Sequence, residues 1–351
     1  MKILVTGSAG HLGEALMRTL CKTKHEVVGL DTKKSAYTNK TGSIADRVFV
    51  RRCMRGVDTV LHTATLHKPH VGTHSKQDFI DTNITGTLNL LEEAASVRVR
   101  AFVYTSTTSA FGDALTPPPG APAVWITEEV VPVPKNIYGV TKLAAENLCE
   151  LFHRNHGLDC IVLRTSRFFP EEDDRAEMRK AYDDGNAKMN EYLYRRVDIE
   201  DVVTAQLLAM RRISSIGFAR YITSATTPFS LKDLPDLRTN APLVVARYFP
   251  GYEAEYARRG WKMFPGIERV YINARAREDL GWRPRHDFGS LLSRLKTGRN
   301  IQSPLARVIG SKGYHDRVFH SEEGPFPLER VMHSGPRLCA GGLHSRQKQR
   351  S

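Results

Sequence analysis

Short apolar runs alternate with longer stretches of helical periodicity through the first half of the chain. Strands are expected at 2–6, 26–30, 59–62, 101–104 and 159–163, and helices at 10–21, 43–54, 76–97 and 137–156. Apolar strands that alternate with helices are typical of a parallel sheet covered on both faces, and right-handed crossovers make such a sheet doubly wound. The pattern therefore predicts an α/β fold of the Rossmann type.

The alternation becomes weaker after Arg164. Helices are expected at 198–210 and 272–280, but prolines are frequent between 226 and 266. We therefore expect a smaller, mixed cap beside the main domain. The predicted division is a doubly wound domain of residues 1–165 with part of 195–225, a cap formed by 166–194 and 226–295, and a C-terminal extension, 296–351, that is flexible after about residue 328.

A glycine-rich turn, TGSAGHLG, joins the first expected strand to the first helix. Gly7 permits the tight turn, Gly10 lets the backbone approach a pyrophosphate, and Gly13 permits close packing of helix on strand. His11 and Leu12 lie between the last two glycines and are further candidate cofactor contacts. A strand before the turn and a helix after it make this pattern a dinucleotide-binding signature.

An acidic residue stands at the end of the second strand. Asp31 lies 18 residues past Gly13, near the spacing of about 20 residues expected for a carboxylate that binds a ribose. Because a carboxylate repels a 2′-phosphate, Asp31 favours NAD over NADP. Lys33 and Lys34 follow at once and can reach such a phosphate, so NADP stays open as a cofactor.

Two side chains at the start of the 137–156 helix are suited to proton transfer. Tyr138 and Lys142 are four residues apart, which places them on one helical face. The ammonium, together with an oxidised nicotinamide, is expected to lower the pKa of the tyrosine from about 10. A hydroxyl-rich segment, 105–112, follows the strand at 101–104 and so lies at the carboxyl edge of the sheet, where these folds bind ligands.

Composition and charge exclude several other classes of protein. The chain has 351 residues, 41% of them apolar, and no apolar run long enough to span a membrane. Its net charge is +13, but residues 294–351 carry 11 basic and 4 acidic side chains, so over half of the excess lies near the C-terminus. Five scattered cysteines do not suggest a disulfide framework. We expect a cytoplasmic protein with no nucleic-acid or membrane partner.

Histidines gather after the strand at 59–62, at positions 67, 70 and 74. No cysteine or carboxylate completes a ligand set before Asp78, and the loop is not expected to be a regular helix. We therefore predict no metal site, and interpret the loop as part of a substrate pocket.

Together these motifs resemble the extended short-chain dehydrogenase/reductases, in the NAD-dependent epimerase/dehydratase branch that includes UDP-glucose 4-epimerase. The resemblance covers about residues 1–295. The family's TGxxGxxG and YxxxK motifs are both present, and 280–284 is similar to its closing signature. Asn83 stands in a helix motif similar to the family's, at the position that supports the active-site backbone.

The resemblance implies specific roles. Tyr138 transfers a proton to or from a substrate hydroxyl, Lys142 holds the nicotinamide ribose, and Thr107 orients the substrate oxygen. The cofactor contacts that it implies beyond the glycine turn and Asp31 are Ser43, Ile44, Thr63, Ala64, Asn83, Tyr138 and Lys142. Thr108 and Arg167 are candidate substrate contacts.

Departures from the family pattern argue against one of the family's reactions and one of its substrate classes. Thr107 is followed by Thr108 and Ser109 instead of the Asp-Glu pair of sugar-nucleotide dehydratases, so dehydration is not expected. Four adjacent acidic residues, 171–174, would repel a diphosphate if they faced the pocket, which disfavours a UDP-sugar. Arg167 can offset part of that repulsion.

Three functions remain open at this point. The first is an NAD(P)-dependent epimerase acting on a secondary alcohol or ketone, with a sugar or a sugar nucleotide as one class of substrate. The second is a net ketoreductase or dehydrogenase of a non-sugar substrate, and the third a cofactor-binding protein without turnover. The helices at 76–97 and 137–156 resemble those of the family's dimer interface, so a homodimer is expected.

Overall fold

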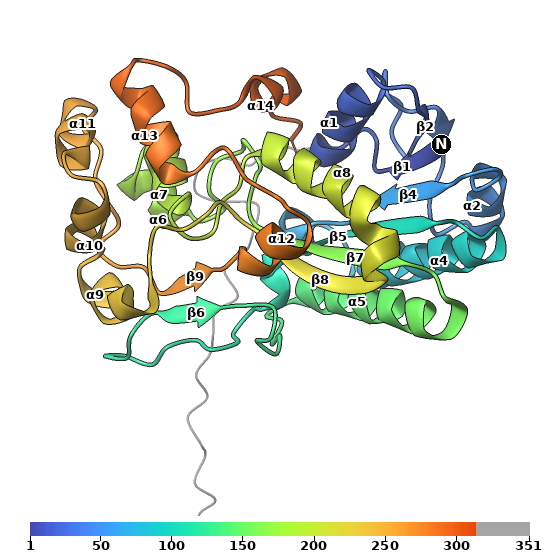
Figure 1. Cartoon of the computed structure of the whole chain (residues 1–351), viewed down its shortest axis with the longest axis horizontal. Coiled ribbons are helices and arrows are strands. Elements are labelled where there is room, and N and C mark those ends of the chain that lie inside the picture. The colour runs from blue at the N-terminus through green and yellow to red at the C-terminus, as the bar shows by residue number, and fades with distance from the viewer. Residues whose placement is uncertain (314–351) are drawn as a thin grey trace, which may run out of the picture.

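The protein is built around a seven-stranded, fully parallel sheet with the strand order β3-β2-β1-β4-β5-β7-β8 (Figure 1). This computed structural model describes residues 1–313. The strands are β1 (Lys2–Thr6), β2 (Glu26–Asp31), β3 (Lys40–Thr41), β4 (Thr59–His62), β5 (Ala101–Thr107), β7 (Cys160–Thr165) and β8 (Phe218–Thr223). The predicted Rossmann-type fold is confirmed. β3 and β8 were not expected from the sequence, because β3 has two exposed polar residues and Arg220 interrupts β8.

Helices cover both faces of the sheet because alternate strand residues point to opposite sides. In β1, Ile3 and Val5 belong to one apolar core and Leu4 to the other. The first core includes α1 (His11–Leu20) and α8 (Ile199–Ile216). The second includes α2 (Arg47–Cys53), α4 (Gly86–Ser96) and α5 (Ile137–His156).

The helix that carries the predicted tyrosine and lysine forms as expected. The side chain of Asn136 caps the N-terminus of α5 by accepting a hydrogen bond from the backbone N–H of Gly139, at 3.1 Å. Gly157, in the left-handed conformation with φ of 64°, ends the helix. Tyr138 therefore lies in the first turn of α5, at the carboxyl edge of the sheet.

The helix predicted at 76–97 is helical but not uniform. It consists of α3 (Lys76–Phe79), a π-helical turn η2 (Ile80–Thr85) and α4. The π turn contains Asn83, and π turns are frequent at functional sites.

The cap contains most of the chain beyond Thr223, together with segments inserted between strands. Its helices are α6 (Ala176–Ala181), α7 (Asp184–Glu191), α9 (Leu234–Thr239), α10 (Ala241–Tyr248), α11 (Tyr252–Arg258) and α13 (Phe288–Lys296). A separate two-stranded sheet pairs β6 (Val124–Ile126), from between β5 and α5, with β9 (Arg269–Tyr271). The expected helix at 272–280 is wrong in its first residues: α12 spans Ala274–Asp279, because the chain leaves β9 only at Tyr271.

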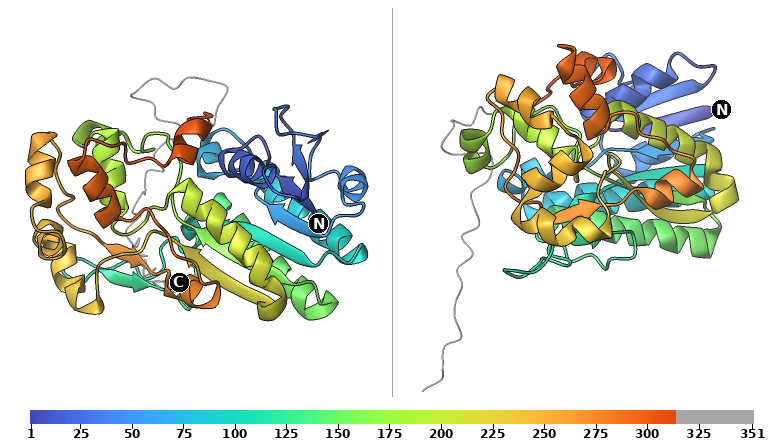
Figure 2. Two further views of the ribbon diagram at one scale, coloured as in Figure 1. Left: turned by 45° about the horizontal axis from the view of Figure 1, so that its top comes forward. Right: turned by 60° about the vertical axis from the view of Figure 1, so that its left-hand side comes forward.

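The described part of the C-terminal extension packs back onto the main domain. Helix α14 (Pro304–Ile309) contacts α1 and α8, which places it against the helices that cover one face of the sheet (Figures 1 and 2). The flexibility predicted after residue 328 lies outside the described residues.

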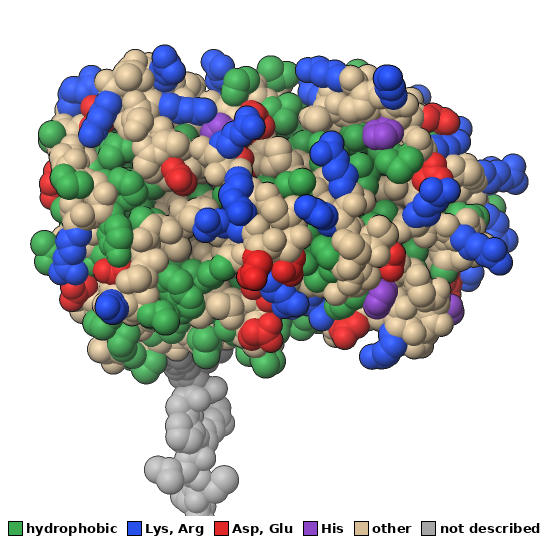
Figure 3. All heavy atoms as spheres, in the orientation of Figure 1, with side chains coloured by type: hydrophobic (Ala, Val, Ile, Leu, Met, Phe, Trp, Pro, Cys, Tyr) green, Lys and Arg blue, Asp and Glu red, His purple; other side chains and the backbone are tan. Residues whose placement is uncertain are grey.

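Charged side chains are dispersed over the surface of the protein. Lys and Arg side chains are scattered among acidic and apolar ones over the face shown in Figure 3. Within residues 1–313, none of the helices is long and apolar enough to cross a membrane.

Candidate active site

A cavity of about 570 Å³ lies at the carboxyl edge of the sheet, between the main domain and the cap. It brings together segments that are far apart in the sequence. All but one of the predicted site residues line it: Gly7, Gly10, His11, Leu12, Gly13, Asp31, Ser43, Ile44, Thr63, Ala64, Thr107, Thr108, Tyr138, Lys142 and Arg167. This is the edge at which parallel α/β sheets bind their ligands.

The glycine turn has no room for side chains. Gly7 has a φ of 72°, and a Cβ on it would lie 2.7 Å from the backbone nitrogen of Ala64. A Cβ on Gly13 would lie 1.9 Å from the carbonyl oxygen of Gly7. Because the cradle is closed to side chains and leads into the N-terminus of α1, it fits a pyrophosphate.

Asp31 is held at the rim of this cradle. Its Oδ2 accepts a hydrogen bond from the backbone N–H of Ala9 at 2.9 Å, and its Oδ1 accepts one from Lys33 N–H at 2.9 Å. Asp31 and Thr32 line the cavity, whereas Lys33 and Lys34 are not among its lining residues. The arrangement fits a ribose diol, and the carboxylate of Asp31 would repel a 2′-phosphate, so NAD fits better than NADP.

Replacement of Asp31 by Asn tests that assignment. We expect the Kd for NAD to rise about tenfold, since a charge-assisted hydrogen bond to the ribose is lost. The preference for NAD over NADP should shrink together with it, because the repelling charge is gone. Titration with both cofactors measures the two effects. Lys34→Gln is the control, and it should leave both Kd values nearly unchanged. An unaltered preference in the Asp31 variant would contradict the assignment.

Residues at the end of β5 contact side chains in the first turns of α5. The backbone carbonyl of Thr105 accepts a hydrogen bond from Lys142 Nζ at 2.6 Å. The hydroxyl of Ser106 donates to the carboxylate of Glu146. The side chain of Thr107 is close enough to the hydroxyl of Tyr138 to favour the ionised form of that hydroxyl. The hydrogen bonds of Thr105 and Ser106 hold Lys142 and Glu146, which lie one turn apart on α5.

Burial controls the ionisation of the tyrosine and the lysine. Burial raises the pKa of Tyr138 to about 12, although the side chain of Thr107 acts in the opposite direction. Burial lowers the pKa of Lys142 to about 7, and the carboxylate of Glu146 counteracts part of that effect. The predicted lowering of the tyrosine pKa by the ammonium is not found here. Lys142 Nζ instead donates to Thr105 and lies 4.2 Å from the ring centre of Tyr104.

Glu146 is a residue that the sequence analysis missed. It is fully buried, and it accepts hydrogen bonds from Arg164 at 2.8 to 3.2 Å. The side chain of Arg220 is 3.3 Å away. The available signal was its position, because Tyr138, Lys142 and Glu146 follow one helical face at intervals of four residues.

Asn83 is the one predicted cofactor contact that does not line the cavity. Its Oδ1 accepts hydrogen bonds from Leu66 N–H at 2.8 Å and from the Thr65 hydroxyl at 2.9 Å. Its Nδ2 donates to Leu66 O at 3.1 Å and to Thr141 Oγ1 at 3.0 Å. Asn83 thus lies behind the wall and ties the loop after β4 to α5, which fits the backbone-supporting position implied by the resemblance.

The histidine loop forms a short 3-10 helix, η1 (Lys68–Gly72), beside the cavity. His67 and His74 line the cavity, and His70 Nδ1 accepts a hydrogen bond from His67 N–H at 2.9 Å. Burial lowers the pKa of His67 well below its usual range, so its ring is uncharged near neutral pH. His67 therefore adds an uncharged ring to this wall, whereas Lys68, at the start of η1, adds a charge.

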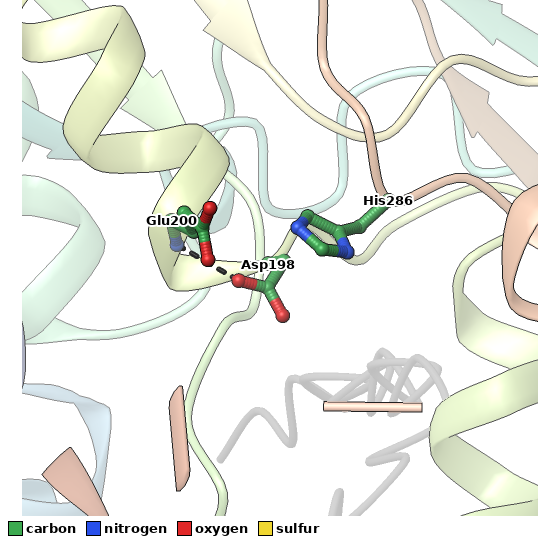
Figure 4. Close-up of side chains that lie close together, drawn as sticks. All are labelled: Asp198, Glu200 and His286. Atoms are coloured by element: carbon green, nitrogen blue, oxygen red, sulfur yellow. Dashed lines mark hydrogen bonds between the residues drawn. The ribbon is translucent and has the colours of Figure 1, made fainter. Parts of the chain in front are cut away.

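A separate group of potential metal ligands lies away from the cavity. Candidate ligand atoms of Asp198, Glu200 and His286 are within 4.8 Å of one another (Figure 4). Asp198 caps α8 by accepting from Glu200 N–H at 2.8 Å, and it also accepts from Ser303 N–H at 3.2 Å. These hydrogen bonds join α8 to the C-terminal extension, so we assign Asp198 to that joint.

Comparisons with known proteins agree with the site. The model of the "NAD dependent epimerase/dehydratase family" matches residues 3–218. A UDP-glucose 4-epimerase of Streptomyces lividans is 30% identical over 46% of this chain and 50% of its own. Sterol demethylase protein B of Methylococcus capsulatus is 28% identical over 64% of this chain and 70% of its own. The chain spans about half the length, or less, of the first curated relatives that it matches.

A solved structure shows the same fold. UDP-glucuronic acid 4-epimerase from Bacillus cereus, in complex with NAD, aligns with a TM-score of 0.59 at 20% identity, over 86% of this chain and all of the other. The family is NAD-dependent, and the glycine cradle and Asp31 fit that cofactor. The matched residues contain every motif that forms the cofactor side of the cavity. The chain belongs to the NAD-dependent epimerase/dehydratase family, within the extended short-chain dehydrogenase/reductases.

Proposed function

We propose that this protein is an NAD-dependent epimerase that oxidises a secondary alcohol of its substrate and reduces the resulting ketone again. One observation carries the proposal: Thr107, Tyr138 and Lys142 share a single cavity with the glycine cradle and Asp31. A proton-transfer group and a dinucleotide cradle on adjoining walls are what hydride-transfer chemistry requires.

The geometry suggests how the residues divide the work. NAD, when bound, supplies the acceptor for a hydride and can give it back. The Tyr138 hydroxyl takes the proton of the substrate alcohol in the oxidising direction and returns it in the reducing one. Thr107, whose side chain is close enough to the Tyr138 hydroxyl to lower its pKa, is placed to hold the same substrate oxygen. Lys142 supplies the positive charge that stabilises the phenolate, provided that it is protonated.

Dehydration is not part of the proposal. Thr108 and Ser109, which line the cavity after Thr107, offer no carboxyl group to eliminate water. Thr108 is a further candidate contact for a substrate hydroxyl.

The absorbance of NADH distinguishes an epimerase from a net dehydrogenase. An epimerase returns its hydride and shows no lasting change in absorbance, whereas a dehydrogenase or ketoreductase changes it in proportion to substrate. Native mass spectrometry of the purified protein should find retained NAD. Cofactor binding without turnover on a wide panel of alcohols would instead favour a protein that has lost its chemistry.

A homodimer is a second part of the proposal. Helices α4 and α5 pack against each other on the outer face of the sheet, in the chain segments that resemble the family's dimer interface. Val140, on α5, is 48% exposed. We expect sedimentation at micromolar concentration to show a dimer and Val140→Glu to shift it towards monomer. Glu150→Gln, almost three turns further along α5, should leave the dimer unchanged. A monomer at every concentration would contradict this.

A further inference from the structure

On the substrate side of the cavity, acidic side chains outnumber basic ones. We define this side by its charged lining residues, which are Lys68, Asp78, Arg167, Glu171, Glu172, Asp174 and Arg195. From it we propose that the substrate is an uncharged, hydroxylated molecule that carries no diphosphate. This rests on the proposed function and identifies the class of alcohol on which that function acts.

The basic side chains of this side are already bound to carboxylates. Arg167 lies 2.6 Å from Asp173, 3.4 Å from Glu191 and 3.7 Å from Asp174. Arg195 lies 2.7 Å from Glu191, and Lys68 lies 3.2 Å from Asp174. Among the described lining residues, only the catalytic Lys142 is a cation without such a carboxylate contact.

Two carboxylates of this region, Glu171 and Glu191, remain ionised near neutral pH. Burial raises the pKa of Glu191, but Arg195, Arg167 and Arg196 outweigh burial and bring it to about 2. Burial likewise raises the pKa of Glu171, but the hydrogen bond with His11 contributes to lowering it to about 2. Glu171 and Glu191 therefore keep their negative charge, and Glu191 holds Arg167 and Arg195 in place.

The formal charges of this cluster sum to a negative value. The basic members are Lys68, Arg167, Arg175, Arg195 and Arg196, and the acidic ones are Asp78, Glu171, Glu172, Asp173, Asp174 and Glu191. Five positive charges therefore face six negative ones. A diphosphate adds about two more negative charges, and phosphate binding usually relies on arginines or lysines that are free to donate to it. Arg167, predicted as a substrate contact, does line the cavity, but its charge is neutralised by its neighbours.

The remaining lining groups suit an uncharged ligand. Residues with hydroxyl side chains line the cavity from several elements, and they include Thr82, Thr107, Thr108 and Ser109. Phe168, Phe169 and Tyr271 add apolar rings. Hydroxyls that donate or accept a hydrogen bond, combined with aromatic faces, are suited to a sugar-like ring or another polyol.

Calorimetry on the NAD-saturated protein tests the proposal. The probes are UDP-glucose, UDP and free glucose, and saturation with NAD prevents the nucleotides from entering the cofactor cradle. We expect UDP-glucose to bind less than about tenfold tighter than glucose, or not to bind at millimolar concentration. An advantage of tenfold or more for UDP-glucose would overturn the proposal.

A charge-releasing variant tests its physical cause. Asp173→Asn removes the closest carboxylate from Arg167 and should tighten UDP binding about fivefold or more. Glu172→Gln is the matched control, because it removes the same charge from a carboxylate that pairs with no described cation, and it should change UDP binding less than twofold. Equal effects of the two variants would contradict the role given to Asp173.

These outcomes are independent of the proposed chemistry. The binding ratio is measured without turnover, so an inactive protein would contradict the proposed function and leave the ratio interpretable. In the same preparation, turnover confined to phosphorylated substrates would overturn the substrate class while supporting the chemistry.

Discussion

The Tyr138→Phe variant should lose about 10²–10⁴-fold in kcat, because it removes the group that moves the substrate proton. The substitution keeps the ring, which is 7% exposed and packed in the cavity wall. It deletes the phenol hydroxyl beside Thr107, while Thr107 Oγ1 still accepts from Ser109 N–H at 3.0 Å. The loss should therefore appear in the chemical step and not in folding. Turnover with saturating NAD and substrate measures it.

Two further measurements make the result specific. The Kd for NAD should stay within about threefold of the unaltered protein, since the cradle and Asp31 are unchanged. Thr107→Ala should cost less than Tyr138→Phe, because it removes a hydrogen bond to the substrate oxygen and not the proton carrier. Full activity of Tyr138→Phe would refute the proposed mechanism, whatever the substrate.

The cofactor half of the site could be predicted because its requirements are local. Gly7 must accept a φ of 72°, and a Cβ on Gly13 would meet a carbonyl oxygen. In the sequence, both requirements appear as the spacing of the glycines in the turn. Asp31 follows from the length of one strand–helix–strand unit. Helical periodicity places Tyr138 and Lys142 on one face, and their position after the glycine-rich turn makes that spacing specific.

The substrate half could not be predicted in the same way. The contacts between Arg167, Asp173 and Glu191 join a loop to a helix, and their geometry depends on how the cap folds. The sequence suggested that the acidic segment would repel a diphosphate, but not that it would neutralise the arginines. The pairing of β6 with β9 joins residues 124–126 to 269–271, which no local pattern indicates.

The buried ion pair of Glu146 was not predicted, for a related reason. A glutamate in an amphipathic helix is usually exposed, and nothing near it in the sequence identifies Arg164 as its partner. The structure places the two side chains together in the core, with 0% and 3% of their side-chain surface exposed. Glu146 then connects the stability of the fold to the ionisation of Lys142.

Glu146→Gln should lower the free energy of unfolding by about 3 kcal/mol, because it leaves Arg164 buried without a counter-charge. It should also move the alkaline limb of the pH–rate profile to lower pH. The carboxylate raises the pKa of Lys142, so its removal lowers that pKa further below about 7. The ammonium that stabilises the phenolate is then lost at a lower pH. Denaturant unfolding and the pH dependence of kcat measure the two effects.

Glu150→Gln is the matched control for both measurements. Glu150 lies one turn further along α5, and it pairs with Arg220 at 2.7 Å, but 43% of its side chain is exposed. Exposed ion pairs contribute less than about 1 kcal/mol, so this variant should unfold almost as the unaltered protein does. Its pH–rate profile should not move, because Glu150 is not among the groups that shift the pKa of Lys142. A loss of stability in Glu146→Gln with an unmoved alkaline limb would show that Glu146 supports the fold alone. A shifted limb would show that the buried carboxylate also sets the charge of the active-site lysine.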